Sequence, residues 1–222
     1  YIKTNVEGTD NVLESAKKHK IKNIIITSTS EVYGTAHRRK LSENDLVNAQ
    51  SPYAASKVAA DQLALSYNLS FKSPVKIIRP FNTFGPRQSF RAVIPTIISQ
   101  ILKGGEMKIG NVNSTRDFTY VDDLCRAYYN VYKSKKCIGQ TINVGCGKEV
   151  SIKDLIIKIK SMTSKKVKIN IEKKRLRPKK SEVNRLRCNN AKIKKLIKWK
   201  NFYTLEEGLI KTIDWFNQKE NL

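Results

Sequence analysis

Two side chains in the segment YAASK could together move a proton: Tyr53 and Lys57. They are four residues apart, which places both on one face of a helix. A phenol has a pKa of about 10, too high for a base at neutral pH, but a neighbouring ammonium stabilises the phenolate and lowers that pKa. The pair is therefore a candidate proton acceptor for an alcohol undergoing oxidation. The same spacing also arises by chance, with the tyrosine in a core and the lysine in solvent.

Polar side chains follow two apolar runs that could be neighbouring strands. TSTSEVYG, residues 27–34, comes directly after Ile24-Ile25-Ile26, and FNTFGPR follows the run PVKIIRP. In parallel α/β sheets, ligands bind at the carboxyl ends of the strands. Glu31, which follows four hydroxyl residues, is therefore a candidate acid or base beside Tyr53. The alternative is a structural carboxylate that accepts hydrogen bonds from the backbone or from an arginine.

The elements that must position these residues alternate between strand and helix. Continuous apolar runs of this kind are typical of strands buried on both faces, and Ser51 with Pro52 is a good helix start. This alternation predicts an α/β fold with a parallel sheet. The predicted elements are a helix over 3–18, a strand over 22–28, a loop over 35–50, a helix from 51, and a strand over 74–80 that Pro80 ends.

The second half of the chain predicts a mixed layer of helices and short strands. Asp122 and Asp123 suit the positive N-terminal end of a helix. Ser151 with Asp154, and Thr204 with Glu207, stand in the register of capping boxes. The predicted elements are a helix over about 91–103, strands near 107–110 and 115–119, a helix from 121, a strand over 140–145, and helices from 151 and 204.

The amino-acid composition argues against a nucleic-acid-binding, a membrane-spanning or a metal-binding protein. The chain has 222 residues, 40% of them apolar, and a formal charge of +24. Residues 151–200 hold 19 Lys/Arg against 3 Asp/Glu, but these lysines are scattered without interleaved aromatic residues, so nucleic-acid binding is not the favoured interpretation. No apolar run reaches 18 residues, so we expect a cytoplasmic protein without a membrane span. The four cysteines lack metal-ligand spacing, and we expect reduced thiols and no metal site.

Taken together, the motifs resemble those of a known enzyme family. The chain is similar to extended short-chain dehydrogenases/reductases of the NAD-dependent epimerase/dehydratase family. Within that family it looks most like the UDP-N-acetylglucosamine 4,6-dehydratases of legionaminic-acid-type pathways. The stretches that carry the resemblance are TNVEGTDNVLE, TSTSEVYG, QSPYAASK, RPFNTFGPRQSFRAVIPT, RDFTYVDD, INVGCGKEVSI, RPKKSEV and YTLEEGLIKTIDWF.

The resemblance implies a division of the chain. Residues 1–85 would form the C-terminal part of an NAD-binding, Rossmann-like parallel sheet. Residues 86–222 would form mainly a smaller mixed α/β substrate domain, with some segments (about 115–145) returning to the sheet. The glycine-rich fingerprint that seats the dinucleotide pyrophosphate is absent from this sequence. We therefore expect the chain to begin downstream of it, with on the order of 80 residues missing.

The resemblance also implies cofactor, substrate and residue roles. Bound NAD would oxidise C4 of a UDP-sugar, Tyr53 would take the O4 proton, and Glu31 would then remove the acidified C5 proton. A homodimer is typical of the family. The implied catalytic residues are Thr29, Glu31, Tyr53 and Lys57; the implied cofactor contacts are Asn5, Ser28, Tyr53, Lys57 and Pro80; the implied substrate contacts are Ser30, Asn82, Arg87, Arg116 and Arg177.

Several alternatives stay open at this point. The Ser30-Glu31 pair also occurs in UDP-glucuronate decarboxylases. The segment TSTSEVYG is therefore compatible with both dehydration and decarboxylation. A nucleotide-sugar 4-epimerase needs no base at C5, which argues against that activity. A non-catalytic fragment that lacks the cofactor cradle is a further alternative. For Arg116, an ion pair with Asp117, Asp122 or Asp123 competes with a role at the substrate diphosphate.

Overall fold

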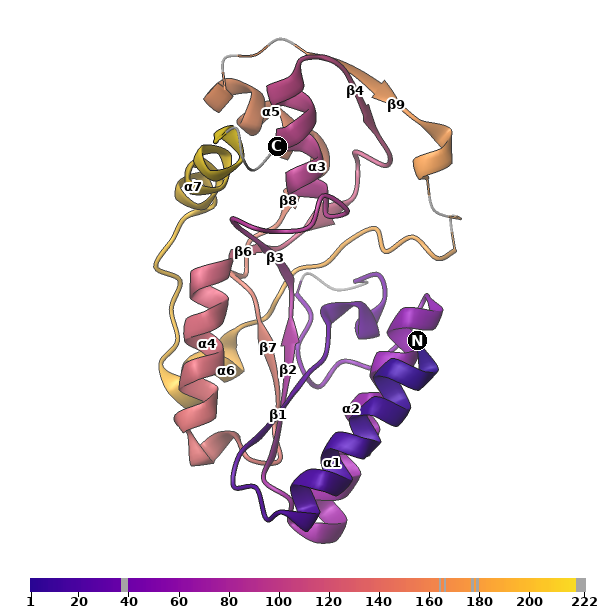
Figure 1. Ribbon diagram of the computed structural model, residues 1–222, viewed down its shortest axis with the longest axis vertical. Coiled ribbons are helices and arrows are strands. Elements are labelled where there is room, and N and C mark those ends of the chain that lie inside the picture. The colour runs from indigo at the N-terminus through magenta and orange to yellow at the C-terminus, as the bar shows by residue number, and fades with distance from the viewer. Residues whose placement is uncertain (37–39, 164, 166, 177, 179, 219–222) are drawn as a thin grey trace.

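A computed structural model describes residues 1–36, 40–163, 165, 167–176, 178 and 180–218. Its centre is a parallel sheet in the order β1-β2-β7, formed by Ile24–Thr27, Val75–Pro80 and Thr141–Val144 (Figure 1). Thr27 lies opposite Ile78, and Arg79 lies opposite Asn143. Helical crossovers between strands are the usual way to make such parallel pairs. The carboxyl ends of the three strands therefore meet at one edge of the sheet.

Helices cover both faces of this sheet. A π-helical segment, Ile2–Glu7, leads into α1 (Gly8–Lys18), which packs with α2 (Pro52–Phe71) on one face. The other face carries α4 (Val121–Lys133) and α6 (Ala191–Ile197) (Figure 1). Alternate strand residues point to opposite faces: Ile77 packs in the α1/α2 cluster and Ile78 in the α4/α6 cluster. This two-sided burial explains the continuous apolar runs.

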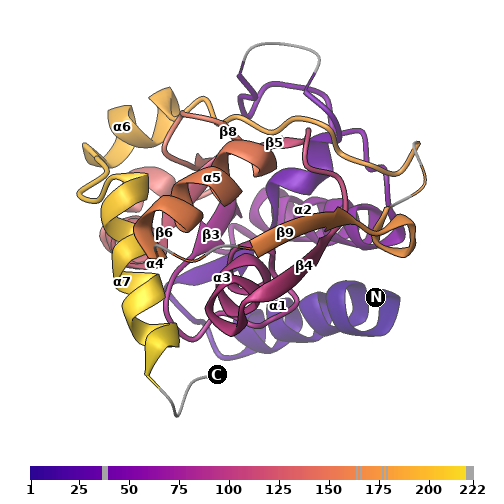
Figure 2. The ribbon, with the colours of Figure 1, turned by 90° about the horizontal axis from the view of Figure 1, so that it is seen from above.

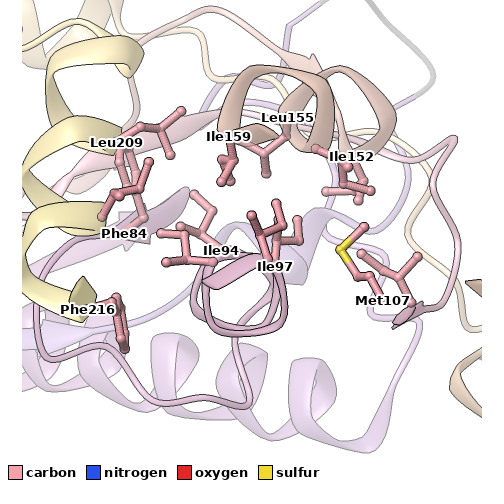
Figure 3. Packing of buried hydrophobic residues seen from close by; sticks show 14 of the residues in the cluster. Phe84, Ile94, Ile97, Met107, Ile152, Leu155, Ile159, Leu209 and Phe216 are labelled. Atoms are coloured by element: carbon pink, nitrogen blue, oxygen red, sulfur yellow. The ribbon is translucent and has the colours of Figure 1, made fainter. Parts of the chain in front are cut away.

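The second layer packs around a separate apolar core. The core is formed by buried residues of short strands and three helices, as Figure 3 shows for Ile94, Leu155 and Leu209. Figure 2 places the β4/β9 pair beside α3, away from α7. The elements are the parallel pairs β3 (Asn82–Phe84) with β6 (Phe118–Tyr120) and β4 (Gly105–Ile109) with β9 (Val167–Ile171), the antiparallel pair β5 (Thr115–Arg116) with β8 (Val150–Ser151), and helices α3 (Val93–Lys103), α5 (Ile152–Thr163) and α7 (Leu205–Asn217).

Most predicted elements are confirmed, but β3, β9 and α6 were not predicted, and three predicted features differ. Residues 2–7 form a π-helical segment rather than the first part of an α-helix. The strand predicted over 115–119 is two strands, because the buried carboxylate of Asp117 interrupts it to accept backbone hydrogen bonds. Asp123 does more than favour a helix start: it is fully buried and accepts the backbone N–H groups of Phe202 and Tyr203.

Capping residues start two helices at the positions predicted from the sequence. Ser51 Oγ accepts the N–H of Ala54 at 3.1 Å, and Pro52 occupies the first helical position. Thr204 and Glu207 form the complete capping box. In the part of the chain that the structure describes, no helix is both long and apolar enough to cross a membrane. The division of the chain near residue 85 stays a prediction.

Candidate active site

The segment after β1 forms a tight turn that presents Thr29 and Glu31. The N–H of Ser28 donates to the carbonyl of Ile78 at 2.7 Å, which extends the sheet pairing by one bond. Thr29 is extended (φ −155°, ψ 152°), and its Oγ1 caps the 3₁₀ turn Ser30–Tyr33 by accepting the N–H of Glu31 at 3.2 Å. Gly34 ends the turn at φ 67°, where a Cβ would lie 2.4 Å from the Asn48 carbonyl oxygen. The backbone around Glu31 is therefore closely constrained.

Tyr53, on the first turn of α2, meets this strand end. The Thr29 hydroxyl lies near the Tyr53 hydroxyl. Burial raises the pKa of Tyr53, and the negative charge of Glu31 raises it further, whereas the Thr29 hydroxyl acts to lower it. Tyr53 is therefore protonated at neutral pH in this structure. Its ring also packs edge-on against Tyr1, with the ring centroids 5.7 Å apart, a neighbour that no sequence pattern indicated.

The pKa of Tyr53 is raised rather than lowered, while a lowering of it by Lys57 itself stays a prediction. The Lys57 ammonium donates to the carbonyl of Thr27 at 2.7 Å. Burial lowers the pKa of Lys57 itself, while the charge of Asp61, one turn further along α2, raises it. Lys57 lies at the carboxyl end of β1.

A cavity of about 360 Å³ lies between the parallel sheet and the second layer. Glu31, Asn82 and Arg116 line it together, so the structure brings three predicted site residues into one space. Asn82 Oδ1 is buried and has no hydrogen-bond partner among the described residues, which leaves an acceptor without a donor. Other charged and polar side chains that line the cavity are Gln88, Arg91, Arg175 and Glu182.

Arg116 has a different acidic partner from those expected. Its Nη2 lies 3.5 Å from Glu182 Oε1, and both side chains are 14% exposed. The sequence alternatives were Asp117, Asp122 and Asp123. Asp117 is instead turned toward three backbone N–H groups, and Asp123 toward the 202–203 backbone. Arg116 and Glu182 therefore share the cavity wall as an ion pair.

The remaining predicted residues occupy several environments. Asn5 Nδ2 donates to Ser56 Oγ at 2.9 Å, which ties the first segment to α2. The Ser28 hydroxyl donates to Asp61 Oδ2 at 2.9 Å. Pro80 lies at the last position of β2. Three of the predicted substrate contacts do not line the cavity as described: Ser30 is buried within the turn, Arg87 is exposed at φ 64°, and Arg177 lies outside the described residues. The predicted catalytic residues Thr29, Tyr53 and Lys57 do not line it either.

Sequence reasoning missed Arg175 and Glu182 as cavity residues. Arg175 is two positions from the predicted Arg177, and it pairs with Glu172 at 2.7 Å. The only available signal for Glu182 was its place in the motif RPKKSEV. Among the described residues, no group of three or more His, Cys, Asp or Glu could hold a metal ion, and the four cysteines are free.

Comparison with known proteins agrees with this arrangement. The family profile described as GDP-mannose 4,6 dehydratase matches residues 1–212. The chain belongs to this family. Its members are NAD-dependent nucleotide-sugar dehydratases and their epimerase and decarboxylase relatives. Solved members superpose on this chain with TM-scores of 0.89 and 0.91, which confirms the fold class predicted from the sequence.

The relatives that match this chain are named for several different activities. A dTDP-D-glucose 4,6-dehydratase of Dictyostelium discoideum is 34% identical over 72% of the chain and 39% of the relative. A UDP-N-acetyl-alpha-D-glucosaminuronate decarboxylase of Bacillus cytotoxicus is 35% identical over 99% and 71%. The solved UDP-glucuronic acid 4-epimerase of Bacillus cereus, in complex with UDP-glucuronic acid and NAD, has a TM-score of 0.91 at 31% identity and covers 98% of this chain and 68% of its own. The chain thus spans 39% of the Dictyostelium discoideum relative, and it spans 49% of the low-salt glycan biosynthesis protein Agl12 of Haloferax volcanii, to which it is 36% identical.

The residues of this chain fit one part of an NAD site. Tyr53 and Lys57 lie at the carboxyl end of β1, where ligands of parallel sheets bind. NAD is the cofactor of this family and is present in the solved neighbours. The glycine-rich loop that would hold the pyrophosphate is not among the 222 residues.

Proposed function

We propose that the protein is a nucleotide-sugar 4,6-dehydratase that uses NAD and acts on UDP-N-acetylglucosamine. The observation that carries this proposal is the position of Glu31. Its carboxylate lines the same cavity as Asn82 and Arg116, and it is close enough to Tyr53 to raise the pKa of that phenol. Groups for proton transfer at two different carbons of one sugar are therefore adjacent.

Different residues of this chain would carry out the successive proton transfers of the reaction. The phenolate form of Tyr53 would be favoured by the positive charge of bound NAD+. That phenolate would accept the proton of the C4 hydroxyl, and Thr29, beside Tyr53, would orient the hydroxyl. Bound NAD would accept hydride from C4 and later return it to C6. Glu31 then removes the C5 proton, which the adjacent C4 ketone acidifies, and protonates the leaving C6 hydroxyl. Water leaves, and the proton that Tyr53 took from O4 is returned to C5 as hydride adds to C6, which gives a 4-keto-6-deoxy sugar.

Before either proton moves, other residues position the two ligands. Lys57 would hold the nicotinamide ribose and would have to exchange its bond to the Thr27 carbonyl for one to the cofactor. Asn5, Ser28 and Pro80 are proposed cofactor contacts around the same strand ends. Asn82, Arg116 and Ser30 are proposed substrate contacts, together with the predicted Arg87 and Arg177. Arg116 would face the diphosphate, since the arginine fork matches phosphate oxygens.

The choice of sugar rests on sequence resemblance and on one relative. The motifs QSPYAASK and RPFNTFGPRQSFRAVIPT resemble those of UDP-N-acetylglucosamine 4,6-dehydratases. The Bacillus cytotoxicus relative has a UDP-N-acetyl sugar acid in its name. We infer a cytoplasmic homodimer on the same resemblance. A decarboxylase is the second candidate, because Ser30-Glu31 suits it and that relative matches nearly the whole chain.

Product analysis separates the candidates. Purified protein with NAD+ is incubated separately with UDP-N-acetylglucosamine and with UDP-N-acetylglucosaminuronic acid. The masses of the products are then measured by mass spectrometry. A dehydratase gives a product lighter by one water from the first sugar, whereas a decarboxylase gives loss of CO2 from the second. An epimerase leaves both masses unchanged. Tyr53→Phe serves as the inactive control, and water loss in that variant would contradict the assignment.

A further inference from the structure

A chain of buried polar side chains lies directly behind the turn that carries Glu31. Asp61 Oδ2 accepts from Ser28 Oγ and from Arg79 Nε, each at 2.9 Å. Arg79 Nη1 donates to the Tyr33 hydroxyl at 2.8 Å, and that hydroxyl donates to Asn143 Oδ1 at 2.8 Å. All five side chains come from residues no more than 5% exposed. These side chains are therefore almost completely removed from solvent, and none of them lines the cavity.

The network joins four separate elements at the edge where the strands end. Arg79 on β2 and Asn143 on β7 lie opposite each other in the sheet register (Figure 1). Asp61 belongs to α2, one helical turn beyond Lys57, so it connects the helix of Tyr53 to the sheet. Ser28 and Tyr33 come just before and at the end of the 3₁₀ turn. The turn that holds Glu31 is therefore tied at both ends.

We propose that the Asp61–Arg79–Tyr33 network is a positioning device that holds the Glu31 turn in register with Tyr53 on α2. The inference rests on the proposed function, since it assigns the network a purpose in the reaction of that same site. None of its members touches the cavity, so Asp61, Arg79 and Tyr33 are positioning residues and not catalytic ones.

The chemistry of the network favours positioning over simple packing. A buried ion pair contributes little net stability compared with apolar side chains of the same volume, but it specifies one geometry. The Tyr33 hydroxyl accepts from Arg79 and donates to Asn143 at the same time, so phenylalanine cannot replace it. The Arg79 guanidinium also lies 4.9 Å from the centre of the Tyr33 ring. The ring therefore has both a polar and a stacked contact that fix its orientation.

The test compares Tyr33→Phe with a control variant, Tyr67→Phe, that also removes only the tyrosine hydroxyl. Tyr67 is also buried, lies on α2, and hydrogen-bonds Asp10 and Glu14, but it is 14 residues from Tyr53, roughly 21 Å along the helix. We measure kcat and KM of the protein with NAD+ and UDP-N-acetylglucosamine. We expect Tyr33→Phe to lower kcat about ten- to hundredfold with little change in KM, as for a misplaced catalytic group. Tyr67→Phe should leave both unchanged.

Amide hydrogen exchange gives a second readout that does not depend on activity. The N–H groups of Glu31 and Gly34 are bonded within the turn, so they report its order. Tyr33→Phe should speed their exchange at least about tenfold, which Tyr67→Phe should not do. Unchanged exchange in Tyr33→Phe overturns the positioning role, whatever the reaction is. Faster exchange with an unchanged kcat also overturns it.

A third variant covers failure of Tyr33→Phe to fold. Asp61→Asn keeps an oxygen that can accept from Ser28 and removes the charge opposite Arg79. It should show the same fall in kcat and the same faster exchange of the turn. Wild-type protein that forms no keto sugar contradicts the proposed function separately, since the exchange result then still decides the role of the network.

Discussion

Asp117 offers a demanding test of how the cavity wall is built. It is fully buried and directly follows Arg116. Its Oδ1 accepts the N–H of Cys146 at 2.8 Å, and its Oδ2 accepts those of Gly147 at 2.8 Å and Cys188 at 3.0 Å. Two loops distant in sequence thus converge on one carboxylate. Asp117→Asn should therefore destabilise the fold and displace Arg116.

The size of the effect follows from these three bonds. A hydrogen bond to a charged group contributes about 1.5–3 kcal/mol to stability. An asparagine oxygen at the Oδ2 position would still accept two bonds, though as a neutral group. Its amide would then face the N–H of Cys146, donor against donor. Losing one bond and weakening two gives an expected loss of about 2–4 kcal/mol in the free energy of unfolding. Burial raises the pKa of Asp117, which means that burying the carboxylate costs free energy. This cost offsets part of the stabilisation that its charged hydrogen bonds provide.

Urea unfolding followed by circular dichroism measures this loss. The control is Asp122→Asn, since Asp122 is exposed at the start of α4 and its substitution should change stability by no more than about 0.5 kcal/mol. A loss below about 1 kcal/mol for Asp117→Asn would refute the reasoning, because it would mean that the three bonds contribute little. Such a small loss would indicate that Asp117 is exposed to solvent and not buried.

Two further predictions follow from the site and its surroundings. Arg116→Lys should raise KM for the UDP-sugar about tenfold and change kcat less than about threefold, because lysine lacks the fork that matches a diphosphate; steady-state kinetics would contradict this with an unchanged KM. Burial raises the pKa of Tyr33 to about 12 from an ordinary value of 10.0. The unfolded chain therefore loses this proton first, so stability is complete below pH 10 and falls as the pH rises through about 12. Urea unfolding across this range should show a shallower fall for Tyr33→Phe, and equal slopes would contradict the assignment.

Local patterns predicted the elements and the edge where the site lies. The isoleucine run of β1 is apolar on both faces because helices cover both, and Ser51-Pro52 determines the start of α2 through a local hydrogen bond. Tyr53 and Glu31 could be assigned to one strand end because the parallel topology leaves few alternatives. These inferences depend only on neighbouring residues and on general sheet geometry.

Contacts between distant residues could not be predicted in the same way. Arg116 pairs with Glu182 across 66 residues, and Arg79 pairs with Asp61 from a different element. No periodicity marks either pair, since each arginine has several carboxylates within reach in the sequence. The bond between Lys57 and the Thr27 carbonyl was missed because backbone acceptors leave no trace in residue types.

The central claim is that Glu31 removes the C5 proton, and one measurement tests it most directly. Glu31→Gln protein with NAD+ is mixed with UDP-N-acetylglucosamine, and the absorbance of reduced nicotinamide and the keto-sugar product are followed in a single turnover. We expect reduced nicotinamide to accumulate, while formation of the 4-keto-6-deoxy sugar falls at least about a hundredfold. Product formation at the wild-type rate would contradict the role of Glu31 and, with it, the dehydratase mechanism.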